Sequence, residues 1–100
     1  MTKEVVLTPL AEKNYRNVIF YLFENWGSAV MNDFMHRFDV TCEFIANAPE
    51  LYPSANVGKR VRKCVVTKHN IIYFRVNKTN IKVLMIFDTR QNPKKLRSLL

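Results

Sequence analysis

The sequence RVRKCVVTKHNIIYFRVNKTNIKVLMIFD, residues 60 to 88, decides the fold of this chain. It contains three runs rich in β-branched and aromatic residues, which are typical of β-strands. These runs cover Arg60 to Thr67, Asn70 to Val76 and Asn80 to Asp88, and polar residues of hairpin-turn length separate them. Two short turns between three strands predict an antiparallel meander.

The residues before this meander predict one further strand and two helices. Lys3 to Leu7 is short and β-branched, and Thr8 can cap a helix that begins at Pro9 and continues to Trp26. After the break at Gly27, Ser28 is a second candidate cap, for a helix that ends near Asn47. The helical apolar stripes are Leu10, Tyr15, Val18, Ile19, Leu22 and Trp26, then Met31, Phe34, Met35, Phe38, Cys42 and Ile45.

The predicted order is β-α-α-β-β-β, which makes the chain an α+β protein. The two helices are joined tightly, so we expect an antiparallel hairpin packed on one face of a small, mainly antiparallel, twisted sheet. One hundred residues predict a single domain, 1–100, with a basic tail over residues 91–100. Basic side chains are expected on the opposite face of the sheet, at its edges and on the tail.

The charge is divided unevenly along the chain. Residues 1–50 hold four Lys or Arg and seven Asp or Glu, whereas residues 51–100 hold twelve Lys or Arg and one Asp. The second half therefore carries a net charge of +11 within a total of +8. This asymmetry indicates a polyanionic or acidic partner. The main basic residues are Lys59, Arg60, Arg62, Lys63, Lys68, Arg75, Arg90, Lys94, Lys95 and Arg97.

Other kinds of site have little support in the sequence. Cys42 and Cys64 are too few for a disulfide framework, and with His36 and His69 they lack zinc-ligand spacing. We therefore expect no metal and no cofactor. We expect no signal peptide, and the sequence has no apolar stretch of about 18 residues, so we expect a cytoplasmic protein without a membrane partner.

Individual positions in the meander carry specific expectations. Alternation along a strand would place Arg60 and Arg62 on one face of the sheet and Lys63 on the other. Tyr73 and Phe74 are adjacent, so one should be buried while the other could stack on a base or on a partner. Asp88, the only acidic residue of the second half, is a candidate partner of Arg90, and His69 falls in a turn.

The order and spacing of three segments resemble the RelE/ParE superfamily of toxins from type II toxin–antitoxin systems. The segments are Thr8-Pro9-Leu10-Ala11, then Val61 through Val76, and finally Ile86 through Pro93. The resemblance implies growth arrest, plasmid stabilisation and a cognate antitoxin whose C-terminal segment wraps the toxin. We expect that segment to be acidic and apolar. Operator DNA would be bound only through the antitoxin.

The resemblance leaves two targets open. RelE-like members cut mRNA in the ribosome, and here Arg60, Arg62 and Arg90 resemble their catalytic arginines. However, Asn70 stands where many RelE members carry an Arg, and neither Tyr nor His follows Arg90. His69, four residues before Tyr73, is similar to a ParE-like pattern, so the sequence favours a ParE-like inhibitor of DNA gyrase.

In that reading the target-binding residues would be Lys59, Lys63, His69, Tyr73, Arg75, Lys94 and Lys95. The alternative is a RelE-like, ribosome-dependent mRNA endonuclease. A further alternative, outside the toxin family, is a small basic nucleic-acid-binding domain.

Overall fold

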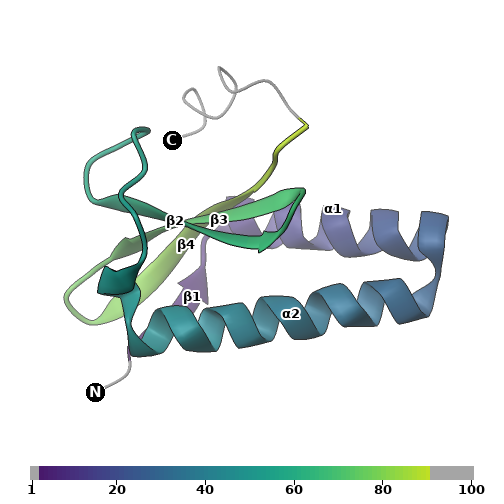
Figure 1. Ribbon diagram of the computed structural model, residues 1–100, viewed down its shortest axis with the longest axis horizontal. Helices are drawn as coiled ribbons and strands as arrows, with labels where there is room; N and C mark the ends of the chain where they lie inside the picture. Colours follow the sequence, from purple (N-terminus) through teal and green to yellow (C-terminus); the bar gives the residue numbers. More distant parts are fainter. Residues whose placement is uncertain (1–2, 91–100) are drawn as a thin grey trace.

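The computed structural model describes residues 3–90, and Figure 1 shows a helical hairpin lying against a small sheet. The described elements are β1 (Glu4–Leu7), α1 (Pro9–Trp26), α2 (Ser28–Asn47), the 3-10 turn η1 (Pro49–Leu51), β2 (Val61–Thr67), β3 (Asn70–Val76) and β4 (Asn80–Asp88). The predicted order is confirmed, and the predicted strand boundaries are confirmed to within one residue. Residues 91–100, with Lys94, Lys95 and Arg97, lie outside the described residues.

The four strands form one sheet in the order β1-β4-β3-β2. β2, β3 and β4 pair antiparallel as a meander, whereas β1 pairs parallel to β4. A parallel pair needs a long crossover connection, which explains why the whole helical hairpin lies between β1 and the meander. The α+β architecture is therefore confirmed, with both helices on one face of the sheet (Figure 1).

The ends of the helices are set by Thr8 and Gly27. The Thr8 hydroxyl accepts a hydrogen bond from Ala11 N at 3.1 Å, as expected of a helix cap. Gly27 ends α1 and precedes α2 with a φ of 88°, a left-handed conformation that glycine adopts freely. The expectation that Ser28 caps α2 is wrong, because Ser28 is already the first helical residue and Gly27 takes the cap position.

The main core lies between the helical hairpin and the sheet. Its buried members are Ala11, Phe34, Phe38, Ile45, Cys64, Ile72, Phe74, Ile81, Val83 and Ile86. Tyr15 of α1 joins the two helices here, because its ring centroid lies 4.8 Å from that of Phe38 and 6.0 Å from that of Phe34. Such aromatic pairs stabilise a helix–helix contact beyond the area that they bury.

The outer face of the sheet, opposite the helices, was expected to be an open surface for basic residues. This expectation is wrong, because the face is partly covered. A second buried cluster, made of Ala55, Val61, Tyr73, Met85 and Phe87, lies on this outer face. The segment that precedes β2 folds back beside it, with Ala55 N donating to Val61 O at 2.7 Å and Lys63 N donating to Pro53 O at 3.1 Å. This segment therefore covers part of the surface that was expected to hold basic residues.

A β-bulge in β4 connects the sheet to the start of α1. Tyr73 pairs with Met85 and Phe74 with Val83, so Leu84 has no opposite residue. The Thr8 hydroxyl donates to Leu84 O at 2.9 Å, and Ile86 N donates to the Asn14 side-chain oxygen at 3.1 Å. α1 is thus held against β4 by polar contacts at the bulge.

Candidate functional site

The strand register separates the basic residues into two groups at opposite ends of the sheet. At one end Asn70 pairs with Asp88, and Arg90 follows. At the other end Arg75 pairs with both Val61 and Lys82. Five residue steps along β3 separate Asn70 from Arg75, which corresponds to about 17 Å. We call Thr67–Asn70 with Asp88–Arg90 the turn end, and Lys59, Arg60, Lys63, Arg75 and Lys82 the basic end.

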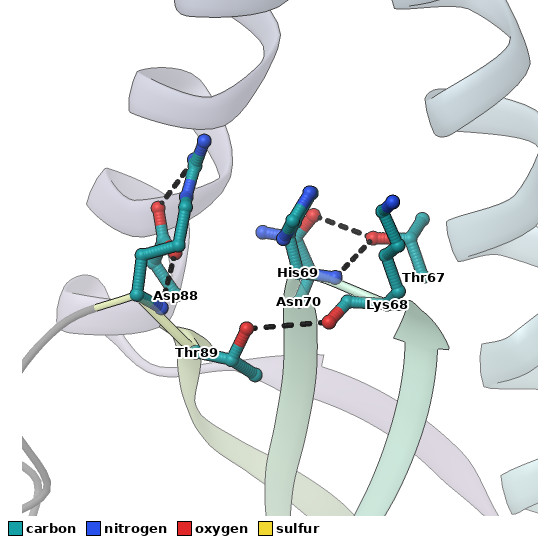
Figure 2. Close-up of polar contacts among 7 residues, drawn as sticks. Thr67, Lys68, His69, Asn70, Asp88 and Thr89 are labelled. Atoms are coloured by element: carbon teal, nitrogen blue, oxygen red, sulfur yellow. Dashed lines mark hydrogen bonds and ion pairs between the residues drawn. The ribbon is translucent and has the colours of Figure 1, made fainter.

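Hydrogen bonds fasten the loop of the turn end, as Figure 2 shows. The Thr67 hydroxyl donates to the buried Asn70 side-chain oxygen at 2.9 Å, and His69 N donates to that hydroxyl at 3.2 Å. Thr89, which follows β4, holds the loop from the other side: its N–H donates to His69 O at 3.0 Å and its hydroxyl donates to Lys68 O at 3.2 Å. The backbone that carries Lys68 and His69 is therefore held in place from both sides.

Asp88 and Arg90 form a bidentate ion pair at the turn end. Arg90 Nε lies 2.9 Å from Asp88 Oδ1, and Arg90 Nη2 lies 2.7 Å from Asp88 Oδ2. Hydrogen bonding to Arg90 lowers the pKa of Asp88, against the opposing effect of its partial burial. The expectation that Asp88 holds Arg90 is confirmed. The Arg90 guanidinium also lies 5.8 Å from the centroid of the Tyr21 ring, which connects β4 to α1.

A groove of about 900 Å³ lies between the two helices, next to the turn end. Tyr21, Trp26, Val30, Asn70, Asp88 and Arg90 are among the residues that line it. The helices continue past the strands beside this groove (Figure 1). Large apolar side chains are exposed on this extension, which we call the hairpin tip and define as Phe20, Tyr21, Phe23, Trp26 and Val30. Trp26 is 67% exposed and Phe20 is 65% exposed, so this surface is apolar and uncovered.

The three arginines expected to act in mRNA cleavage do not meet. Arg60 has a φ of 59° and precedes β2, so the expectation that it shares a strand face with Arg62 is wrong. Arg62 pairs with the buried Phe74, and its Nη1 donates to Tyr52 O at 2.6 Å. Arg90 lies at the other end of the sheet, in its pair with Asp88. Lys63 and Arg62 do occupy opposite faces, as expected, because Lys63 pairs with Tyr73.

Tyr73 is the clearest correction among the expected target-binding residues. Its side chain is only 5% exposed, and its ring contacts Phe87 edge-to-face, with centroids 6.3 Å apart. Burial raises the pKa of its hydroxyl. Tyr73 and Phe74 do point to opposite faces, but both faces are covered at this position, so neither ring is available to stack on a target.

Of the remaining expected residues that the structure describes, Lys59 and Lys63 are exposed and His69 and Arg75 are half-buried. Lys59 is exposed and its carbonyl accepts a hydrogen bond from Arg75 Nε at 3.3 Å, while His69 is half-buried in the turn. Lys82 and the hairpin-tip residues Phe20 and Phe23 were not among the predicted site residues. A signal for each was present: Lys82 alternates with buried Ile81 and Val83, and the two phenylalanines lie off the apolar stripe of α1.

Metal and thiol chemistry have no support within residues 3–90. No group of three or more His, Cys, Asp or Glu side chains is placed there to hold a metal ion. Burial raises the pKa of Cys42 to about 12, so its thiol stays protonated and unreactive near neutral pH. Nor does either helix within these residues have the length and hydrophobicity needed to span a membrane.

Comparisons with known proteins agree with this architecture. Residues 5–93 match the family described as the ParE toxin of the type II toxin–antitoxin system parDE. Among solved structures, a chain from "Chromosomal ParDE TA system from P. aeruginosa" superposes with a TM-score of 0.75 at 12% sequence identity, covering 87% of this chain and 96% of that one. At this identity the superposition shows a shared fold. A search of curated protein sequences finds no significant match.

Proposed function

Because the chain belongs to the ParE toxin family of type II toxin–antitoxin systems, we propose that it arrests growth by binding and inhibiting DNA gyrase, and that a cognate antitoxin neutralises it. In this proposal the toxin acts in the cytoplasm as an inhibitor, without cutting nucleic acid. The family membership supports the toxin role, and the placement of the arginines supports inhibition over cleavage.

We favour inhibition over mRNA cleavage because Arg60, Arg62 and Arg90 lie apart from one another. A ribonuclease of this kind needs cations gathered around one phosphate, where charge develops during cleavage. Here Arg90 is engaged by both carboxylate oxygens of Asp88, and Arg62 is engaged by a loop carbonyl. Arg60 lies near the far end of β3 from Arg90. A single phosphate would not be in reach of all three without rearrangement of these contacts.

The antitoxin contact is proposed at the groove and the hairpin tip. The tip exposes five large apolar side chains, and Arg37 and Arg90 line the groove beside them. An extended or helical segment with apolar anchors has matching chemistry, because apolar residues would fill the groove, and an acidic residue would approach Lys13, which lines the groove and belongs to neither the Asp33–Arg37 nor the Asp88–Arg90 pair. We therefore propose the C-terminal segment of the antitoxin as the occupant.

The direct test is a supercoiling assay with purified gyrase and relaxed plasmid. We expect the purified chain to block supercoiling, and an equimolar amount of antitoxin to restore it. In parallel, the chain is added to a translation reaction primed with ready-made mRNA, and the RNA 5′ ends are mapped. Intact mRNA is expected. Cuts that appear only during translation, together with normal supercoiling, would replace gyrase inhibition with the RelE-like activity.

A further inference from the structure

The basic end carries positive charge that no ion pair within residues 3–90 neutralises. Arg75 lies directly opposite Lys82 on neighbouring strands, and like charges in such a pair destabilise a sheet. Both ion pairs found within residues 3–90 lie elsewhere, at Asp33–Arg37 and Asp88–Arg90. The nearest acidic residue by register is Glu4, which pairs with Asn80 and forms no ion pair with Lys82 among these contacts.

The geometry of the basic end orders these cations along one surface. Lys82 and Arg75 are cross-strand neighbours, so their Cα atoms lie about 5 Å apart. Lys63 is opposite Tyr73, and Tyr73 precedes Arg75 by two residues on the same face of β3, a step of about 7 Å. Arg75 is also braced by its hydrogen bond to the carbonyl of Lys59. Lys82, Arg75 and Lys63 therefore form a row of cations on the outer face, and a backbone carbonyl already fixes the position of the Arg75 side chain.

We propose that the basic end binds the phosphodiester backbone of nucleic acid without reading its sequence. A row of cations that has no ion-pair partner among the described residues suits closely spaced phosphates, which release counterions when they are neutralised. An acidic protein surface fits less well, because protein partners are usually anchored by exposed apolar residues. Within residues 3–90, the exposed large apolar residues are at the hairpin tip, Phe44, Leu51 and Val65. Only Val65 lies on the same strand face as a member of the basic end, two residues from Lys63.

This proposal goes beyond gyrase inhibition, and it gives nucleic acid as a ligand of Lys59, Lys63 and Arg75, which are also among the residues expected to bind the target. The basic end is at the other end of the sheet from the groove assigned to the antitoxin. Nucleic acid and antitoxin could therefore bind together. In such a complex the antitoxin would recognise the operator sequence and the toxin would contact the backbone. The proposal thus departs from the expectation that DNA is reached only through the antitoxin.

The test measures binding of the purified chain to a short random-sequence DNA duplex by fluorescence anisotropy, across a series of salt concentrations. An RNA hairpin of similar length is measured beside it, to distinguish the two sources of phosphate. We compare the wild type with Arg75→Gln/Lys82→Gln. We expect the variant to bind at least tenfold more weakly at low salt. The slope of log affinity against log salt should fall by about 1.8, since each phosphate contact contributes about 0.9.

Two further variants make the result specific to this surface. Arg16→Gln/Lys68→Gln removes the same charge from exposed positions outside the basic end and should bind like the wild type. Arg75→Lys/Lys82→Arg keeps both charges and should retain binding.

The proposal is overturned if the wild type does not bind either nucleic acid at low salt, or if the two neutralising pairs weaken binding equally. If the wild type bound polyglutamate as tightly as it binds nucleic acid, and Arg75→Gln/Lys82→Gln weakened that binding too, the surface would instead be assigned to an acidic protein. Circular dichroism checks that each variant is folded, and the assay requires neither gyrase nor antitoxin.

Discussion

The two halves of the helical hairpin place their large apolar side chains in opposite environments. Where α1 and α2 lie over the sheet, Ala11 and Ile45 are fully buried and Phe34 is 2% exposed. At the hairpin tip, beyond the sheet, Trp26 is 67% exposed and Phe23 is 52% exposed. The sheet covers only part of the hairpin, so the same kind of side chain forms a core in one half and an open surface in the other.

This difference separates residues that maintain the fold from residues available to a partner. An apolar side chain that stays exposed contributes little to folding, because it is in contact with water in both the folded and the unfolded state. Five such residues gathered on one tip make a patch that favours association. We therefore expect substitutions in the two halves to affect different measurements.

The largest expected effect comes from the buried half. Phe74→Ala should lower the free energy of unfolding by about 3–5 kcal/mol, because it removes a fully buried ring from the core between the sheet and the helices. The same truncation at the hairpin tip, Phe20→Ala, should change it by less than about 0.5 kcal/mol. Urea titrations followed by circular dichroism measure both values. Equal losses at the two positions would show that the tip is packed in solution, and the comparison would then fail.

The sequence predicted the elements well because their signals are local. Turn residues and β-branched runs define β2, β3 and β4, and Pro9 and Gly27 mark helix boundaries that need no tertiary information. The failures at Arg60 and Ser28 are also local in extent. Ser28 is the first residue of α2 and Arg60 directly precedes β2, and a positive φ at Gly27 or at Arg60 sets where each element begins.

The candidate site was harder to predict because it depends on register and coverage. That Arg90 and Arg75 lie at opposite ends of the sheet follows from the pairing of Asn70 with Asp88 and of Arg75 with Lys82. The bulge at Leu84 shifts this register by one residue, so the pairing cannot be extrapolated from one end of the strands to the other. The burial of Tyr73 requires that the segment before β2 folds over the outer face. Neither follows from the alternation of residues within a single strand.

An intermediate effect is expected on antitoxin binding. Trp26→Ala should weaken binding of the cognate antitoxin by about 10-fold to 100-fold, because a large aromatic in an interface is often a main source of affinity. The free energy of unfolding should stay close to that of the wild type, since the ring is already in solvent. Isothermal titration calorimetry with the antitoxin measures the change.

Phe44→Ala is the matched control for this substitution. Phe44 is 62% exposed, so it resembles Trp26 in exposure, but it lies near the other end of α2 and does not line the groove. We expect antitoxin affinity to be unchanged in this variant. If Phe44→Ala weakened binding as much as Trp26→Ala, the antitoxin would cover the helices generally and the assignment to the hairpin tip would be wrong.

The smallest expected effect lies at the boundary between the two halves, where Arg90 joins Asp88 of β4 to Tyr21 of α1. Asp88→Asn should lower the melting temperature slightly at neutral pH, because a surface ion pair contributes little. The pKa of Asp88 is lowered in the folded protein from the ordinary 3.8, so its contribution is present above that value and is lost as the pH falls through the folded pKa. The melting temperatures of wild type and variant should therefore converge in acid.

Asp33→Asn, which breaks the more exposed pair with Arg37, should change the melting temperature less at neutral pH. A difference at Asp88 that persisted in acid would mean that shape or neutral hydrogen bonding, and not the charge on Asp88, holds the hairpin tip to the sheet.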